Sequence, residues 1–464
     1  MFEAEVYAAR RAKLASKIKD GVIILIGNKE VGMNYSGNTY KFRQDSTFLY
    51  YFGLNLPDLV GVIDAETNES ILFGDDLSID DIVWTGPQPT VKESAASVGV
   101  TNSNSISGLF GYVNKIQVKG RKIHFLPFYR GENEIFFSDM IGVKPSSLSS
   151  LSSRELIRAV VDMRLVKDDK EIAEIEKACA IGSKMHKTAM KMCKPGVTEQ
   201  HIGAIVDSIA YQYGSQVSFP TILTQHGETM HNSYRPIPLQ AGKLMLTDAG
   251  AENEMNYCSD FTRTIPVSGK YDSRQRDIYQ AVLDCHNLVP KIAKPGVTWF
   301  DVHMRICKLL TERLQALGLM KGNVEDSVKN GAHALFFPHG LGHNMGLDVH
   351  DMEGLGQEYV GFDDEVRPVK QFGTNALRMG RRLVPGYVIT DEPGCYFIPQ
   401  LIAQWKADKT NSEYLNFDKI EQYLDFGGVR IEDDVLITRD GCRFLGEDRA
   451  PVEIKDIEAF MENN

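Results

Sequence analysis

The sequence predicts an α/β (α+β) protein with two domains, and three observations support this fold class. At 464 residues, the chain is long for a single hydrophobic core. Its first part combines short strand patterns with polar turns, before a long helical pattern begins at Lys167. The remainder contains an internal repeat. We therefore expect a mixed α/β domain over residues 1–165 and a second domain, made of two similar halves, over residues 166–464.

The elements of the first part are short. The apolar run Val22 to Ile26 in "GVIILIGN" predicts a buried strand, and "LVGVIDAETNESILFG" (residues 59–74) predicts two strands around a polar turn, as in a hairpin. The Ser-rich stretch Ser146–Glu155 is expected to be a connection. From Lys167 to Cys193, apolar residues recur at three- and four-residue spacings, which predicts a long helix.

The second part contains the segment "KPGVT" twice, at Lys194–Thr198 and again at Lys294–Thr298. Each copy follows a helical stretch, and each threonine is suited to cap the next helix. Pro and Gly between helices are also ordinary turn chemistry, so a coincidence is the alternative explanation. The matching helices on both sides favour a duplication, which would place a site between two facing halves.

Composition excludes several classes of function. Apolar residues at 43% and charged residues at 24% are typical of a soluble globular protein, and the net charge of −11 argues against nucleic-acid binding. The longest apolar run, Val22 to Ile26, is too short to cross a bilayer, and the charged N-terminus lacks the apolar core of a signal peptide. The seven cysteines are scattered without a C-x-x-C pair, which favours reduced thiols. We expect a cytoplasmic protein without membrane association.

Acidic residues occur at strand ends in both halves. "KLMLTDAGAENEMNYCSDFTRTIPV" (residues 243–267) predicts two strands around a polar turn, with Asp248 and Asp260 nearly opposite each other. Glu392 in "VITDEPG" is expected at a strand end. In "VRIEDDVLI", alternation places Arg430 and Glu432 on one face of a strand. Two aspartates at strand ends, or a local Arg–Glu ion pair, would be unremarkable if considered singly.

The stretch "FFPHGLGHNMGLDVHD" (residues 336–351) contains His339, His343 and His350. Its glycines argue against a helical His-x-x-x-His metal site, since glycine is costly inside a helix. Any one of these histidines alone would more often be structural. A histidine together with four carboxylates in one cleft would instead suit two divalent cations, of which Mn²⁺, Co²⁺ and Zn²⁺ favour such ligands. Such a pair of ions would point to hydrolysis. Spacing alone does not show that these five residues meet.

As a set, four motifs resemble the proline-specific branch of the pita-bread metallopeptidases, the Xaa-Pro aminopeptidases and Xaa-Pro dipeptidases (prolidases). They are "TDAGAE…YCSDFTRTIPVSGKY", "FFPHGLGHNMGLDVHD", "PGYVITDEPGCYFIP" and "GGVRIEDDVLIT", in family order. "FRQDSTFLYYFGL" (residues 42–54) is similar to part of that branch's N-terminal domain. The resemblance implies a pseudo-two-fold pita-bread catalytic domain after an aminopeptidase P-type domain, and two metal ions, with Mn²⁺ the first expectation. The residues matching the five metal ligands are Asp248, Asp260, His343, Glu392 and Glu432.

The resemblance also implies roles for further residues. His231 and His350 match histidines that bind substrate and stabilise the tetrahedral intermediate, and Glu392 is expected to carry a proton. His339 matches a histidine beside the site, and Arg430 a residue that supports the ligands. In two places the chain departs from the family pattern. The Asp248–Asp260 interval is one residue longer than usual, and the shorter stretch before His231 weakens that match and leaves His226 without a role.

The implied reaction is metal-assisted hydrolysis of the bond before proline in short peptides. Arg378 matches the arginine that binds the substrate carboxylate in prolidases, although a solvated arginine is the alternative. Trp84 matches a tryptophan that reaches a neighbouring subunit's site, implying a homodimer or larger assembly; a buried core tryptophan is the alternative. A non-catalytic pita-bread module that binds peptides or proteins is the rival function, and all five ligand residues count against it. They also count against a metal-free hydrolase of creatinase type, and the large N-terminal domain counts against a methionine aminopeptidase.

Overall fold

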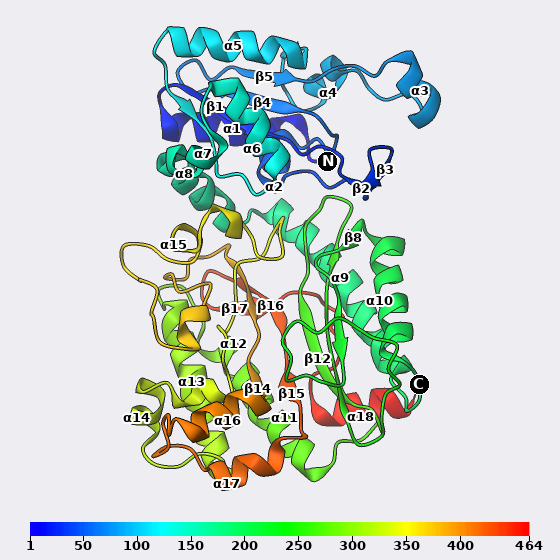
Figure 1. Cartoon of the computed structure of the whole chain (residues 1–464), viewed down its shortest axis with the longest axis vertical. Helices are drawn as coiled ribbons and strands as arrows, with labels where there is room; N and C mark the ends of the chain where they lie inside the picture. The colour runs from blue at the N-terminus through cyan, green and yellow to red at the C-terminus, as the bar shows by residue number, and fades with distance from the viewer. Residues whose placement is uncertain (464) are drawn as a thin grey trace. The chain divides into compact units, whose positions relative to one another are not determined.

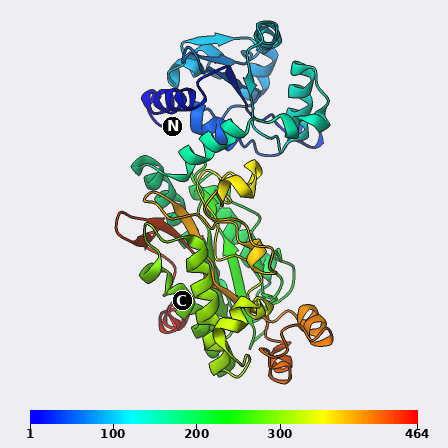
Figure 2. The same cartoon turned by 90° about the vertical axis from the view of Figure 1, so that its left-hand side faces the viewer.

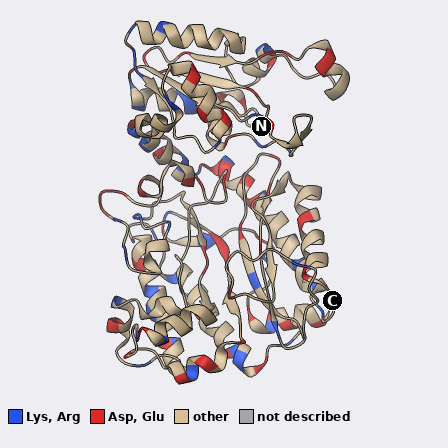
Figure 3. Ribbon diagram, in the orientation of Figure 1, with Lys and Arg blue, Asp and Glu red and all other residues tan. Residues whose placement is uncertain are grey.

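The computed structural model describes residues 1–463, and its internal contacts divide the chain into two units. The first unit is Met1–Arg164 with the short segment Gly354–Tyr359, and the second takes the other described residues from Leu165 onward. Figures 1 and 2 show the helices and strands of both units. Among residues 1–463, none of the helices combines the length and apolar character that crossing a bilayer requires. Acidic and basic segments are interspersed along the ribbons of both units (Figure 3).

The first unit is built on a five-stranded sheet with the strand order β6-β5-β4-β1-β7. The predicted buried strand is β1 (Val22–Ile26), which pairs antiparallel with β4 (Val60–Asp64) and parallel with β7 (Ile123–His124). The predicted hairpin is confirmed, since β4 pairs antiparallel with β5 (Ser70–Phe73), which in turn pairs parallel with β6 (Asn102–Asn104). The sheet therefore mixes parallel and antiparallel pairs.

The helices of the first unit are α1 (Ala4–Ile18), α2 (Ser46–Phe52), α3 (Ile79–Thr85), α4 (Val91–Ser97), α5 (Ile106–Val118), α6 (Gly131–Ile141), α7 (Pro145–Leu151) and α8 (Arg154–Leu165). Residues of α5, α6 and α7 complete the apolar core of the sheet, whereas α3 has no buried residue and stands apart from the sheet (Figure 1). A small ribbon of β2 (Gly32–Tyr35) and β3 (Asn38–Thr39) completes the unit.

The expectation that Ser146–Glu155 is an irregular connection is wrong, because most of it lies in helices α7 and α8. Pro145 at the first helical turn suits a helix start, and Leu148 is buried in the core of the unit. The hydroxyls of Ser150 and Ser152 donate to backbone carbonyls three residues earlier, at 2.8 Å. Serine composition alone did not reveal these hydrogen bonds between serine hydroxyls and the backbone.

The second unit contains two three-stranded sheets, with strand orders β12-β10-β9 and β13-β16-β17. Their strands are β9 (Ile222–Thr224), β10 (Leu244–Ala249), β12 (Phe261–Pro266), β13 (Val388–Asp391), β16 (Asp433–Ile437) and β17 (Cys442–Phe444). Two smaller ladders pair β8 (Gln216–Val217) with β11 (Ala251–Glu252) and β14 (Gly394–Tyr396) with β15 (Gly428–Arg430). An isolated bridge between Thr262 and Glu432 connects the two halves.

Long helices pack around these sheets (Figure 1). They are α9 (Asp169–Met192), α10 (Glu199–Tyr213), α11 (Ser273–His286), α13 (Trp299–Ala316) and α18 (Ile454–Glu462). Shorter helical segments are α12 (Val289–Ile292), α14 (Val324–Lys329), α15 (Gln357–Val360), α16 (Pro399–Ala407), α17 (Phe417–Ile420), η1 (Ala332–Leu335), η2 (Glu353–Leu355), η3 (Thr374–Ala376) and η4 (Glu421–Tyr423). The predicted helix from Lys167 to Cys193 is α9, which packs against β10 and β12.

The two KPGVT segments adopt the same local structure. Gly196 and Gly296 have positive φ angles of 89° and 88°, a backbone region that favours glycine. The Thr198 hydroxyl caps α10 and the Thr298 hydroxyl caps α13, each accepting from a backbone N–H three residues later. The repeat in the sequence is therefore a repeat in the fold.

Candidate active site

A cavity of about 490 Å³ lies in the second unit, among the ends of its strands. Ten of the eleven residues singled out from the sequence line it: His231, Asp248, Asp260, His339, His343, His350, Arg378, Glu392, Arg430 and Glu432. The remaining one, Trp84, belongs to the other unit. Residues separated by about two hundred positions in the sequence thus line the same cavity.

Strand ends present the four carboxylates. Asp248 is the penultimate residue of β10, and Asp260 directly precedes β12. In the β10–β12 ladder, Asp248 pairs with Thr262, so the two aspartates are diagonal neighbours rather than directly opposed. In the other half, Glu392 directly follows β13 and Glu432 directly precedes β16. The expectation of one continuous strand through "VRIEDDVLI" is wrong, because the chain breaks between β15 and β16, at Ile431 and Glu432.

His343 is held by its backbone in a non-helical loop, as its neighbouring glycines indicated. Its N–H donates to the Thr390 hydroxyl at 3.1 Å, and its carbonyl accepts from the Thr390 N–H at 3.0 Å. Gly342 allows this approach, because a Cβ atom there would lie 1.9 Å from the Thr390 carbonyl oxygen. The glycines that exclude a helix therefore let the loop lie against β13.

Asp260, His343 and Glu432 form the tightest group in the cavity. All three are buried, and their potential ligand atoms lie within 4.8 Å of one another. Nε2 of His343 is 3.4 Å from Oδ2 of Asp260. An imidazole and two carboxylates at such separations can be gathered by one small cation.

Electrostatics in the cavity disfavour ionised carboxylates. Burial, together with the neighbouring acids, raises the pKa of Asp260 and of Glu432 well above their usual values. Burial also raises the pKa of Glu392 to about 8, although Arg430 opposes this shift. Burial lowers the pKa of His343, so its imidazole is neutral and able to act as a ligand. Oδ1 of Asp248 and Oδ1 of Asp260 are buried without a hydrogen-bond partner among the described residues. Divalent cations would relieve each of these costs, so the donor set fits them.

Arg430 connects ligand-type residues of both halves. Its Nη2 donates to Oδ2 of Asp248 at 2.5 Å, and its Nε donates to the Thr262 hydroxyl at 3.1 Å. Thr262 in turn donates to Oε2 of Glu432 at 2.7 Å, whereas Nε of Arg430 is 3.9 Å from that oxygen. The alternative that Arg430 forms only a local ion pair with Glu432 is therefore wrong, because its closest carboxylate partner is Asp248. Sequence reasoning missed Tyr396, whose hydroxyl contacts Nη1 of Arg430 at 3.0 Å and Nε2 of His339 at 2.8 Å.

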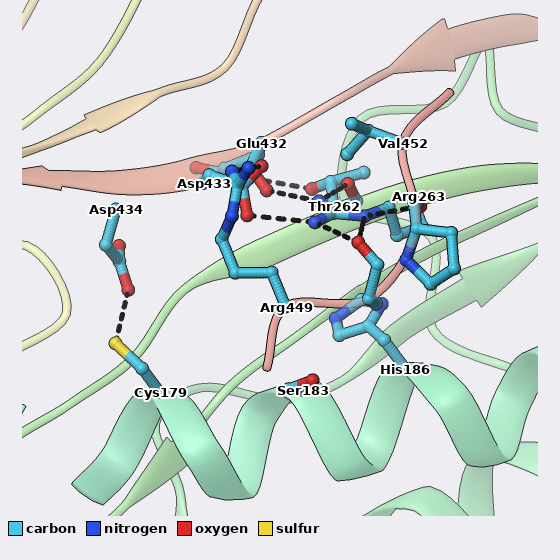
Figure 4. A network of polar contacts seen from close by, with 12 residues as sticks. Cys179, Ser183, His186, Thr262, Arg263, Glu432, Asp433, Asp434, Arg449 and Val452 are labelled. Atoms are coloured by element: carbon cyan, nitrogen blue, oxygen red, sulfur yellow. Dashed lines mark hydrogen bonds and ion pairs between the residues drawn. The ribbon is translucent and has the colours of Figure 1, made fainter. Parts of the chain in front are cut away.

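A second layer of polar contacts beneath the cavity holds the ligand-type residues in place (Figure 4). Oδ2 of Asp434 accepts from the Asp260 N–H at 3.1 Å and from the Cys179 thiol of α9 at 3.5 Å. Arg263 donates to the Glu432 carbonyl at 2.7 Å and to Oδ1 of Asp433 at 2.9 Å. Sequence reasoning missed this layer, although the acidic pair after Glu432 in "IEDD" was a visible signal.

The remaining cavity residues lie closer to solvent. Nδ1 of His350 is 2.5 Å from Oε2 of Glu353, and Glu353 also forms an ion pair with Arg378. The rings of His343 and His350 are 3.9 Å apart. His231 lines the cavity but is exposed, and His226 lies outside the cavity lining, with its Nδ1 3.2 Å from Glu228. Glu353 is the residue of this group that sequence reasoning did not single out.

Trp84 lies at the end of helix α3 in the first unit, and its side chain is 86% exposed. The alternative of a buried core tryptophan is therefore wrong. Its suggested contact with a neighbouring subunit stays a prediction.

Comparison with known proteins agrees with this arrangement. Residues 173–439 match the model of metallopeptidase family M24, which is more than half of the chain. The chain belongs to metallopeptidase family M24. Residues 7–124 match a second model, the aminopeptidase P N-terminal domain. The mixed α/β fold with a pita-bread domain, predicted from the sequence, is confirmed.

Relatives of this M24 protein align along nearly their whole length. A probable Xaa-Pro aminopeptidase of Verticillium alfalfae is 31% identical, covering 99% of this chain and 97% of that protein. The Xaa-Pro dipeptidase of Homo sapiens is 30% identical, covering 98% and 93%. Among solved structures, Escherichia coli aminopeptidase P with the inhibitor Pro-Leu has a TM-score of 0.81 at 27% identity, covering 100% of this chain and 99% of that one.

Proposed function

We propose that this chain is a dinuclear-metal peptidase that hydrolyses the bond between an N-terminal residue and proline, in Xaa-Pro dipeptides or in longer peptides that begin with Xaa-Pro. The observation that carries the proposal is the meeting of four carboxylates and His343 in one cavity. The names of the relatives, Xaa-Pro aminopeptidase and Xaa-Pro dipeptidase, support the substrate class.

The five ligand-type residues would hold two divalent cations. In this proposal Asp260 and Glu432 serve both ions, Asp248 completes one, and His343 with Glu392 completes the other. When bound, the cations supply Lewis acidity and a water-derived nucleophile near neutral pH. Mn²⁺ is the proposed physiological metal, on the carboxylate-rich, thiol-free lining of the cavity. Zn²⁺ and Co²⁺ remain candidates, and a zinc-substituted aminopeptidase P with product is among the similar structures.

The protein's own residues would bind the peptide and move its protons. Glu392 lies in the cavity wall, where its carboxylate can accept a proton and pass it to the leaving proline nitrogen. The carboxylate of Glu353 is hydrogen-bonded to Nδ1 of His350, which leaves Nε2 of His350 to contact the reacting carbonyl. His231, at the exposed side of the cavity, would bind the peptide. Apolar lining from Phe219, Pro220, Ile222 and Val349 would receive the proline ring.

Arg378 is the proposed determinant of peptide length. A guanidinium can bind the carboxylate that directly follows proline in a dipeptide, whereas a longer peptide places that carboxylate further away. In the structure Arg378 lines the cavity and is paired with Glu353, so a substrate carboxylate would exchange with Glu353. On this basis the chain is proposed to accept dipeptides.

Hydrolysis of Ala-Pro and Ala-Pro-Gly by Mn²⁺-loaded protein and by a chelated control tests the proposal. We expect metal-dependent cleavage of Ala-Pro, with the Arg378→Lys variant raising KM for Ala-Pro more than for Ala-Pro-Gly. Preferred cleavage of the tripeptide, with no effect of Arg378→Lys, would make the chain an aminopeptidase without a carboxylate clamp. Failure to cleave either peptide with metal bound would favour the non-catalytic peptide-binding module.

We further propose a cytoplasmic homodimer or larger homo-oligomer. All seven cysteines are free thiols in the structure, which is typical of a reducing compartment. The exposed Trp84, with Ile79 and Val83 on the same short helix, offers apolar surface for a second copy. Sedimentation of the wild type beside Trp84→Ser tests the assembly, and a monomeric wild type would exclude it.

A further inference from the structure

A second group of ligand-type side chains lies outside the catalytic cavity. His303 and Cys307 are four residues apart on α13, which places them on one face of that helix. His333 belongs to η1, which packs against α13. One potential ligand atom from each residue lies within 4.8 Å of the other two. None of the three lines the catalytic cavity.

These three side chains are buried with little compensation. His303 and His333 are each 1% exposed, and Cys307 is fully buried. Sγ of Cys307 lies 3.5 Å from Nε2 of His303, whereas Nδ1 of His333 has no hydrogen-bond partner among residues 1–463. A buried polar atom without a partner is costly, and a ligand that it binds would remove that cost.

The two imidazoles have the protonation that a metal requires, whereas burial raises the pKa of the Cys307 thiol, so that thiol stays protonated until a cation binds. Burial lowers the pKa of His303 to about 3 and that of His333 to about 4, so both imidazoles are neutral and present lone pairs. The Cys307 thiol would lose its proton on binding, so each divalent cation bound would release one proton to solvent. Two imidazoles and one thiolate form a softer donor set than the carboxylates of the cavity, and they suit Zn²⁺.

We propose that His303, Cys307 and His333 form a structural site for a thiophilic cation, most simply Zn²⁺, separate from the catalytic cavity. The site would join α13 to η1. The chain runs directly from η1 into the histidine stretch, and the ring of Phe337 lies 5.7 Å from that of His303 and 4.7 Å from that of His339. A cation here would therefore stabilise the segment that leads into the catalytic cavity.

Cobalt distinguishes the two sites, because only a thiolate ligand produces a sulfur-to-cobalt charge-transfer band in the near ultraviolet. The full-length chain, stripped with a chelator and kept reduced, is titrated with Co²⁺. We expect a band with the intensity of one thiolate-bound Co²⁺ per chain, although its saturation can need further equivalents because the catalytic cavity also takes up Co²⁺. The band should be absent in Cys307→Ser. Cys442→Ser is the matched control and should keep the band. Asp260→Asn should keep the band as well, even if the catalytic ions are lost. The proposed catalytic metal site and the proposed thiolate site are therefore tested independently of each other.

Two further measurements guard against a misfolded variant. His333→Ala leaves the thiol in place and should weaken Co²⁺ binding at the band by tenfold or more, with an unchanged circular dichroism spectrum. X-ray absorption of the zinc-loaded wild type should show a sulfur neighbour at about 2.3 Å. A wild type with no charge-transfer band and no sulfur neighbour, or a band that survives Cys307→Ser, would overturn the proposal.

Discussion

The two halves of the second unit repeat a backbone framework but carry different chemistry. In the first half, the N–H of Gly196 donates to the Leu239 carbonyl, and in the second the N–H of Gly296 donates to the Leu383 carbonyl. Each framework then leads into a strand, β10 or β13. Asp248 near the end of β10 and Glu392 just after β13 occupy matching places relative to their frameworks.

The difference lies in what each half adds. The first half contributes two aspartates, joined by the short stretch from β10 to β12. The second contributes two glutamates, separated by an excursion that contains α16 and α17, and it alone supplies His343 and Arg430. A duplicated framework can thus keep its backbone while the side chains of its halves diverge. We infer that both halves contribute residues to the peptide-binding lining, and that the second half adds the imidazole ligand and the arginines.

The largest expected effect comes from the carboxylates that directly precede β12 and β16. Asp260→Asn and Glu432→Gln should each reduce kcat/KM for Ala-Pro more than about a hundredfold, since removing even a residue that supports a ligand costs about 10- to 100-fold. Metal content measured beside activity should fall in both variants. A large loss of kcat/KM in only one of the two variants would show that the two carboxylates are not equivalent.

Metal removal should make stability depend on pH. Burial raises the pKa of Glu392 from 4.5 to about 8, so in the metal-free protein its ionisation favours the unfolded state. The free energy of unfolding of the chelated protein should therefore fall as pH rises through this interval, and added Mn²⁺ should restore it. Glu392→Gln should flatten the decline. A chelated wild type that becomes more stable over the same interval would contradict this account.

The paired glycines test whether the frameworks are equivalent. Gly196→Ala and Gly296→Ala place a Cβ atom in a left-handed backbone, although neither meets a neighbouring atom. Each should lower the free energy of unfolding by about 1–2 kcal/mol. Gly354→Ala, at a position with open space and no positive φ, is the control. Urea denaturation measures all three, and unequal losses at the paired sites would weaken the symmetry.

The helix caps give the smallest expected effect. Thr198→Ala and Thr298→Ala each remove an N-cap, at a cost of about 1 kcal/mol. The cost should be larger at Thr298, because its hydroxyl also donates to Asp301 at 2.7 Å. Thermal unfolding of both variants, with the serine substitutions as rescue, measures the difference. Equal shifts would mean that the Asp301 contact contributes nothing.

Local signals explain what the sequence could predict. Strand and turn patterns were sufficient to place Glu392 just after a strand, and the two KPGVT segments foretold the repeated framework. The break at Ile431 and Glu432 could not be seen, because it depends on pairing with two separate strands. The roles assigned to the ligand-type residues stay predictions.

Contacts between distant segments were beyond the reach of any local pattern. Asp434 supports the backbone of Asp260, and Glu353 forms an ion pair with Arg378. Each of these interactions depends on residues that become neighbours only after folding. The residue types were visible in the sequence, but their partners were not.

The exposure of Trp84 also makes the protein its own fluorescent reporter. Of the three tryptophans, Trp84 is 86% exposed, whereas Trp299 and Trp405 are 0% and 8% exposed. A dissolved quencher such as iodide should therefore extinguish mainly the emission from helix α3. Any second chain that covers this helix would shield Trp84, so association can be followed on the unlabelled protein.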